Sequence, residues 1–248
     1  MTTALLQVRD LGHGYGQRPV LEGVSFEVQR GEFVALLGPS GAGKTTLIKC
    51  ITGQLKPQRG QVLVAGAEPA TLQGRERRRV AVIFQQFNLV RRLSALDNVL
   101  AGRLGHVPSW RGWTRQFERA DQRLALQCLE RVGLLAAAGQ RADTLSGGQQ
   151  QRVAIARALA QQPELIVADE PVASLDPAIS AGILELLQGI CRDDGVTVVC
   201  SLHQLHLARQ YAQRLVGLSA GQLRFDARAD HVDEATTAAL YESVFTAA

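Results

Sequence analysis

Residues 33–45 read Phe-Val-Ala-Leu-Leu-Gly-Pro-Ser-Gly-Ala-Gly-Lys-Thr, an apolar run that leads into a glycine-rich loop. The run predicts a buried strand, and residues 45–52 after the loop have helical spacing. In this setting the loop fits G-x-x-x-x-G-K-[ST], a Walker A phosphate site. Its glycines let backbone N–H groups surround phosphates, and the helix N-terminus adds a favourable dipole. We therefore expect Lys44 to reach the β- and γ-phosphates of a nucleotide and Thr45 to ligate Mg²⁺; a glycine turn with an incidental lysine is the alternative.

Further short apolar runs rich in β-branched residues predict more strands, at residues 80–84, 165–168 and 196–200. Helical patterns lie between the runs, at 149–161 and 178–191. Asp176-Pro177 precedes the second of these helices as cap and first helical residue. Alternating strands and helices predict an α/β fold, a doubly wound core built on a parallel sheet.

Two regions depart from this alternation. Residues 5–9, 24–29 and 61–64 predict strands joined by glycine turns, hence a small antiparallel sheet against the core. From about residue 88 to 160 apolar residues recur at helical spacing, which predicts an inserted helical subdomain. We therefore expect one domain over residues 1–248, with the core and β subdomain at 1–87 and 161–248 and the helical subdomain at 88–160.

The composition is that of an ordinary globular chain of 248 residues with 46% apolar content. No apolar run approaches the roughly 18 residues that span a bilayer, and the N-terminus lacks a signal-peptide pattern, so we expect a cytoplasmic location. The net charge of +4 is spread along the chain, so no nucleic acid partner is expected. The four cysteines lack CxxC spacing, which favours buried reduced thiols over a metal site.

Two adjacent acids, Asp169 and Glu170, follow the apolar run at 165–168. Charges at the end of a buried strand are costly unless they serve a function. We expect Asp169 to bind Mg²⁺ and Glu170 to polarise the attacking water. The alternative is a pair of helix-capping acids, which Pro171 keeps open.

Two further polar residues, Gln85 and His203, follow predicted strands. Alone, each has an ordinary structural interpretation, as a loop amide and as a packed histidine. In an open α/β sheet, however, the ligand crevice lies beyond the carboxyl ends of the strands. Convergence with Lys44 on that edge favours Gln85 for metal and water and His203 for the γ-phosphate.

A second glycine-rich turn, Ser146-Gly147-Gly148-Gln149, precedes the helical pattern at 149–161. A helix that begins here presents free N–H groups and a serine hydroxyl in its first turn. One nucleotide needs only one cradle, so a second implies that ATP is held between two surfaces; a plain helix cap is the alternative. Tyr15, between two glycines, offers a ring for stacking on adenine, or is an exposed turn aromatic.

Taken in order, these motifs resemble the nucleotide-binding subunit of ATP-binding cassette (ABC) transporters, and the resemblance covers nearly the whole chain. The matching motifs are the A-loop aromatic Tyr15, Walker A (38–46), the Q-loop Gln85, the signature motif (145–149), Walker B (165–170), the D-loop (174–176) and the switch histidine His203. The resemblance implies a P-loop core with an N-terminal antiparallel β subdomain and an inserted α-helical subdomain. It assigns nucleotide binding to Tyr15 and to two sets of residues: Gly38, Pro39, Ser40, Gly41, Ala42, Gly43, Lys44, Thr45 and Thr46, and Ser146, Gly147, Gly148 and Gln149.

The resemblance also implies how such a subunit works. In the family two subunits pair head to tail, so Ser146 to Gln149 would face the ATP held by Lys44 of a second copy. ATP and Mg²⁺ are the implied cofactors. The implied partners are a second copy in a homodimer, integral-membrane permease subunits and, indirectly, a periplasmic or extracellular solute-binding protein. The subunit would lie at the cytoplasmic face of the inner membrane, held by the permease.

Within the family the chain resembles the ATPases of phosphonate importers, in residues 84–94, 98–105, 109–113 and 201–205. Gln204 stands where the wider family has an aspartate after the switch histidine, as in the phosphonate group. The implied activity is a phosphonate-transporting ATPase, a translocase, with phosphite or phosphate esters as further cargoes.

Two alternatives remain: an auxiliary soluble ATPase of a phosphonate-degrading complex, and an importer ATPase for another small solute. A soluble cassette ATPase that remodels nucleic acid, ribosomes or an enzyme complex commonly carries two cassettes, a coiled-coil insertion or a basic arm, and none is evident in the sequence. A P-loop small-molecule kinase would leave Ser146 to Gln149 and His203 without a use.

Overall fold

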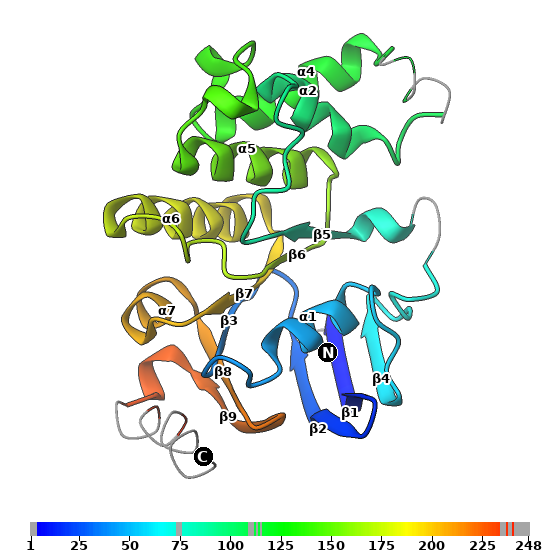
Figure 1. Ribbon diagram of the computed structural model, residues 1–248, viewed down its shortest axis with the longest axis vertical. Coiled ribbons are helices and arrows are strands. Elements are labelled where there is room, and N and C mark those ends of the chain that lie inside the picture. Colours follow the sequence, from blue (N-terminus) through cyan, green and yellow to red (C-terminus); the bar gives the residue numbers. More distant parts are fainter. Residues whose placement is uncertain are drawn as a thin grey trace.

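Two β-sheets and a group of helices make up the computed structural model, which describes residues 4–72, 76–108, 112, 114, 116–233, 237 and 240 (Figure 1). The larger sheet has the strand order β5-β6-β7-β3-β8-β9. Its strands are β3 (Phe33–Leu37), β5 (Val80–Ile83), β6 (Leu165–Ala168), β7 (Thr197–Leu202), β8 (Arg214–Ser219) and β9 (Gln222–Arg228). The first five in spatial order are parallel and β9 is antiparallel to β8. The predicted α/β core is confirmed.

The central strands of the larger sheet are buried on both faces. Phe33 and Leu37 of β3 pack in an apolar cluster with helix α6 (Pro177–Asp194). Leu36 of the same strand packs in a second cluster, with α1 (Lys44–Ile51) and the smaller sheet. Successive side chains of a strand point to opposite faces, so a strand covered on both sides is apolar along its whole length. This explains the uninterrupted apolar runs in the sequence.

The smaller sheet is antiparallel and has the strand order β2-β1-β4. Its strands are β1 (Leu6–Tyr15), β2 (Arg18–Val28) and β4 (Arg59–Val64). The predicted antiparallel sheet is therefore confirmed, but β1 and β2 are longer than the predicted 5–9 and 24–29. Their pairing shifts register between Val8 and Leu11 and again near His13. Such irregularities break the alternation of apolar and polar residues from which strands are predicted.

The remaining helices are α2 (Ala95–Leu100), α4 (Arg119–Arg131), α5 (Gly147–Ala160) and α7 (Leu205–Tyr211). Short 3-10 turns accompany them at Glu76–Arg79, Ala101–Arg103, Leu135–Ala137, Ala142–Thr144 and Ala229–His231. In Figure 1, α2, α4 and α5 gather beyond α6, at the end of the molecule away from the smaller sheet. Residues 109–111 and 113, in the segment with two tryptophans, lie outside the described residues. No helix in the described part of the chain combines the length and the apolar character needed to span a membrane.

The sequence patterns do not predict α7, β8 or β9. Gly217 interrupts the apolar run of β8, as a turn glycine would. In the structure the ring of Phe225 on β9 covers this glycine, and a Cβ at Gly217 would lie 2.3 Å from Phe225 Cε1. The glycine therefore marks a close approach between strands, which spacing along the chain does not distinguish from a turn.

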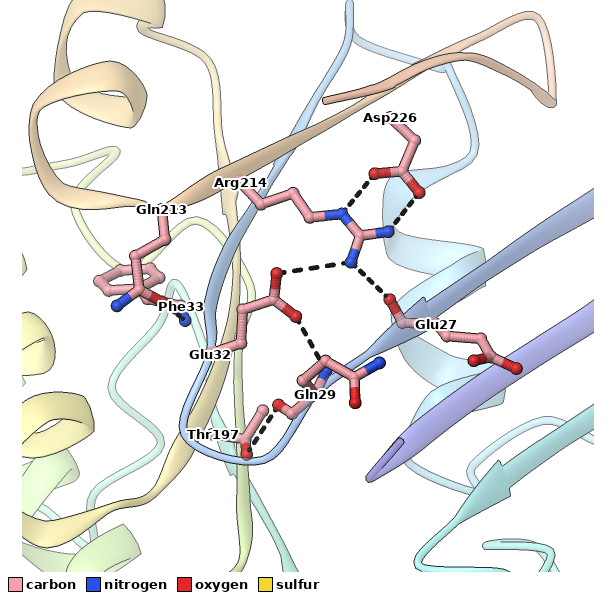
Figure 2. A network of polar contacts seen from close by, with 8 residues as sticks. All are labelled: Glu27, Gln29, Glu32, Phe33, Thr197, Gln213, Arg214 and Asp226. Atoms are coloured by element: carbon pink, nitrogen blue, oxygen red, sulfur yellow. Dashed lines mark hydrogen bonds and ion pairs between the residues drawn. The ribbon is translucent and has the colours of Figure 1, made fainter. Parts of the chain in front are cut away.

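A polar network fixes the smaller sheet to the larger one (Figure 2). Arg214, the first residue of β8, donates to both carboxylate oxygens of Asp226 on β9, at 2.5 and 2.6 Å. It also donates to Glu27 O at 2.9 Å and to Glu32 Oε1 at 3.4 Å, on either side of the turn between β2 and β3. The network lies where β3 and β8 begin. The opposite edge, where the strands end, belongs to the loops that carry the motifs.

Candidate functional site

Four neighbouring strands end at one edge of the larger sheet, and each leads to a residue that the motifs single out. β3 continues into the phosphate loop, β5 leads to Gln85, β6 to Asp169 and β7 to His203. The order β5-β6-β7-β3 makes these strands neighbours. Because the strands are parallel, their carboxyl ends lie together. The structure thus brings the phosphate loop, the acids and the histidine to one place.

The phosphate loop closes around the ammonium of Lys44, a residue that is only 5% exposed. Lys44 Nζ donates to Gly38 O at 2.7 Å and to Pro39 O at 3.1 Å. Burial lowers the pKa of Lys44, whereas the nearby charges of Glu170 and Asp169 act in the opposite direction. Both acids therefore lie within electrostatic reach of the ammonium.

The other residues of the phosphate loop and of the first turn of α1 differ in their exposure to solvent. Helix α1 begins at Lys44, after Gly43 in a left-handed conformation with φ +102°. Ser40 and Thr45 are exposed, whereas Thr46 is buried. The Thr45 side chain is therefore open to a ligand, while Thr46 belongs to the packed side of the helix.

Two glycines of the loop should respond differently to replacement by alanine. At Gly38 a Cβ would lie 2.1 Å from the carbonyl oxygen of Leu218, which is backbone of β8, whereas at Gly41 (φ +80°) nothing lies within 4 Å of it. We expect Gly38→Ala to lower the free energy of unfolding by about 3 kcal/mol, because it forces a clash with backbone, and Gly41→Ala by about 1 kcal/mol, because it adds only left-handed strain. Urea unfolding measures both values, and equal midpoints would contradict the prediction.

Asp169 and Glu170 are held by the strands on either side of them. Asp169 N donates to Ile83 O of β5 at 2.8 Å, and Asp169 Oδ1 accepts from Ser201 Oγ at 2.9 Å. Glu170 N donates to the same serine oxygen at 2.8 Å. Glu170 Oε1 lies 2.5 Å from His203 Nε2. The carboxylate of Asp169 is thus bound to the serine and that of Glu170 to the histidine; Ser201 lies at the end of β7 and His203 directly follows the strand.

Ser201 is a site residue that the motifs miss. It is fully buried and is the penultimate residue of β7. The signal in the sequence is a hydroxyl in a mostly apolar strand, two residues before His203. A buried polar side chain needs partners, but its partners are known only once β6 is placed beside β7.

The second glycine-rich turn begins helix α5 with a reciprocal pair of hydrogen bonds. Ser146 Oγ accepts from Gln149 N at 3.3 Å, and Ser146 N donates to Gln149 Oε1 at 2.9 Å. Such a capping box stabilises the first turn of a helix. A Cβ at Gly148 would lie 2.6 Å from Ile179 Cγ2, so this turn packs against the start of α6. Figure 1 shows α6 and strands β5 and β6 between α5 and α1, so the two glycine-rich sites are apart within one chain.

Tyr15 and Gln85 lie on the surface. Tyr15 ends β1 and is 51% exposed, and its ring meets that of His13 edge-on, with centroids 5.3 Å apart. Gln85 is exposed in the bend after β5. An exposed aromatic face is available for stacking on a base. The roles of both residues toward a nucleotide stay predictions.

The oxygen donors at this edge of the sheet fit a magnesium ion that is coordinated both by the protein and by the phosphates of a nucleotide. Mg²⁺ prefers oxygen ligands and is usually bound by one or two carboxylates together with phosphates and waters. Asp169 would supply a carboxylate, Thr45 a hydroxyl and Gln85 an amide oxygen. Within the described ranges no group of three or more His, Cys, Asp or Glu side chains is placed to hold an ion.

Fold and site together define a P-loop ATPase whose helical part carries a second glycine-rich turn. The chain belongs to the ABC transporter family, whose model matches residues 21–173. It is 46% identical over 247 residues to the hypophosphite import ATP-binding protein HtxD of Stutzerimonas stutzeri, covering 98% of this chain and 72% of that protein. It is 48% identical over 226 residues to the phosphonates import ATP-binding protein PhnC 1 of Rhodopseudomonas palustris, covering 90% and 84%. As a family member it binds ATP and is an ATPase.

Solved structures of ATP-binding cassettes have the same fold. The ADP conformation of MJ1267, a cassette of an ABC transporter, superposes with a TM-score of 0.86 at 26% identity, covering all of both chains. A dimer of the cassette MJ0796 bound to ADP and Pi, in a post-hydrolysis state, superposes with a TM-score of 0.77 at 32% identity, covering 90% of this chain and 98% of that one. The fold class predicted from the sequence is therefore confirmed.

Proposed function

We propose that this chain is the ATP-hydrolysing subunit of an importer for phosphonates. The observation that carries the proposal is the convergence of Lys44, Asp169, Glu170 and His203 at one edge of the sheet, in a chain 48% identical to a protein named for phosphonate import. A relative named for hypophosphite import supports a second candidate, an importer ATPase for another small phosphorus oxyanion.

The proposed site divides binding and catalysis among residues of the sheet edge. Lys44 binds the β- and γ-phosphates, and Glu170 orients the attacking water. His203, 2.5 Å from Glu170, contacts the γ-phosphate. Thr45, Gln85 and Asp169 would hold Mg²⁺, which would supply positive charge to offset that of the phosphates. The other residues of the phosphate loop surround the phosphates through their backbone, and Tyr15 stacks on adenine.

In this function two copies close head to tail, and the Ser146–Gln149 turn of one copy completes the site of the other. Two observations support the arrangement. The turn lies apart from Lys44 within the chain, and the helix it caps begins at Gly147, so its first-turn N–H groups lack partners within the helix. A related cassette is a dimer with ADP and Pi bound. Hydrolysis then depends on closure of the dimer, because neither copy holds all the donors.

We propose that the contact with a membrane permease includes residues 86–95, which follow Gln85, together with a cleft of about 340 Å³ between β5 and the 3-10 turn Ala101–Arg103. Its lining includes Arg77, Arg78, Val82 and Gly102. Val82 of β5 lies three residues before Gln85, so a partner seated in this cleft would contact the strand that leads into the Gln85 bend. The permease would hold the subunit at the cytoplasmic face of the inner membrane and receive cargo from a periplasmic or extracellular solute-binding protein. In this assembly residues 88–160 form the helical subdomain, and 1–87 with 161–248 the core and β subdomain.

Reconstitution tests the cargo. The chain is combined in vesicles with the permease and binding protein encoded beside it, and ATPase stimulation is measured with alkylphosphonate, phosphite, hypophosphite, phosphate and methionine. We expect alkylphosphonate to stimulate most, because the named relatives point to that class of cargo. If only another solute stimulates, the assignment of phosphonate as the cargo is wrong, and the ATPase assignment stands. Copurification with soluble lyase components in place of a permease would indicate the auxiliary role instead.

A further inference from the structure

The hydroxyl of Ser201 contacts both acids of the site. It donates to Asp169 Oδ1 at 2.9 Å and accepts from Glu170 N at 2.8 Å. A serine hydroxyl has a single proton, which here goes to the carboxylate, so the backbone N–H must be the donor in the second contact. The two hydrogen bonds are therefore compatible: the hydroxyl donates in one and accepts in the other.

Burial makes these two hydrogen bonds hard to replace. Ser201 is 0% exposed, so water does not reach its side chain. Removing the hydroxyl would leave Asp169 Oδ1 and Glu170 N, which belong to residues of intermediate exposure, without their partner on the buried side of the site. The carboxylate of Asp169 would then be free to rotate away from the orientation it has in the structure.

The backbone at Glu170 explains why its N–H needs a fixed partner. Glu170 has φ +50°, in the left-handed region that side-chain-bearing residues rarely occupy. This turn directs the glutamate toward His203, to which it is bound at 2.5 Å. The hydrogen bond from Glu170 N to Ser201 holds the turn at its first atom. Strained backbone of this kind persists when surrounding contacts determine it.

We infer that Ser201 is a positioning residue for the ATPase reaction, which orients Asp169 toward the metal and holds the Glu170 turn in place. The inference rests on the proposed roles of Asp169 and Glu170. Residues that hydrogen-bond to a metal ligand without touching the metal typically contribute 10- to 100-fold to metal affinity or activity. Ser201 acts through the two acids and touches neither nucleotide nor metal.

The test separates the metal-dependent part of nucleotide binding from the rest. The full-length protein is titrated with a fluorescent non-hydrolysable ATP analogue, once with Mg²⁺ and once with EDTA. We call the ratio of the affinity with Mg²⁺ to the affinity in EDTA the gain from Mg²⁺. For Ser201→Ala we expect this gain to fall about 10-fold, while the affinity in EDTA is unchanged. Turnover should fall by a similar factor. Ser201→Thr, which keeps the hydroxyl, should restore the gain from Mg²⁺.

Thr197→Val is the matched control. Thr197 is also fully buried on β7, and its hydroxyl accepts from Gly31 N at 2.9 Å, at the other end of the strand. The control therefore loses a buried hydroxyl without touching the site, and we expect it to keep the full gain from Mg²⁺. If Thr197→Val and Ser201→Ala reduce the gain from Mg²⁺ equally, the inference is wrong, because the effect would then come from a general disturbance of β7.

Asp169→Asn distinguishes failure of the inference from failure of the proposed function. If Asp169→Asn loses the gain from Mg²⁺ and Ser201→Ala keeps it, the positioning role is wrong and the metal role of Asp169 stands. If Asp169→Asn also keeps the gain, the proposed metal role is wrong, and the inference falls with it.

Discussion

Glu170→Gln is expected to lower ATP turnover by about 10²- to 10³-fold while ATP binding is retained, because glutamine keeps the shape of the side chain but not the charge that polarises water. ATP then stays intact in the closed state, so the variant should accumulate as a dimer when ATP is added. Phosphate release measures turnover, and size-exclusion chromatography with ATP measures the dimer. Hydrolysis at the parental rate would contradict the role of Glu170.

Glu164→Gln is the matched control for this prediction. Glu164 directly precedes β6, at the end of the strand opposite to Glu170, and is bound to Arg30 at 2.5 Å and to Arg79. The hydrogen bond from Arg79 lowers the pKa of Glu164, so the carboxylate is charged in the folded protein. Because this pair is partly exposed, we expect its loss to cost less than about 1 kcal/mol of stability and to leave turnover unchanged.

Two inactive variants are expected to restore activity when they are mixed. Lys44→Ala removes the phosphate-binding ammonium, and Ser146→Asp keeps a helix-capping residue but points a negative charge at the phosphates held by the second copy. Each alone should lose about 10²-fold or more of its hydrolysis, because each site of its dimer lacks one donor. A mixed dimer has one site with both defects and one with neither, so random pairing should restore roughly a quarter of the parental rate.

The control for the mixing experiment is Ser146→Asn, which also caps a helix but carries no charge. It should retain more activity than Ser146→Asp, since repulsion of the phosphates is absent. Circular dichroism of both variants checks that helix α5 is intact. A mixture no more active than its components would show that Lys44 and Ser146 do not serve one site from two chains.

Much of the fold follows from the sequence, for reasons visible in particular elements. β3, β6 and β7 are covered on both faces, so their apolar runs stand out from the surrounding chain. β8 contains Gly217 at a close approach to β9, and the runs of β1 and β2 shift register, so their limits follow from cross-strand contacts. Prediction is thus most reliable where burial is uniform and weakest where a neighbouring strand determines the conformation.

The phosphate loop, the adjacent acids and the turn at Ser146 can be predicted from the sequence, because each depends on residues next to one another in the chain. The position of β7 between β6 and β3, which brings Ser201 to Asp169 and Glu170, becomes known only from the folded chain. The same is true of the separation between helices α5 and α1, which the two glycine-rich turns precede. The physical reason is that turns and caps are stabilised by local hydrogen bonds, whereas the order of strands is set by burying both faces of the sheet, which involves the whole chain.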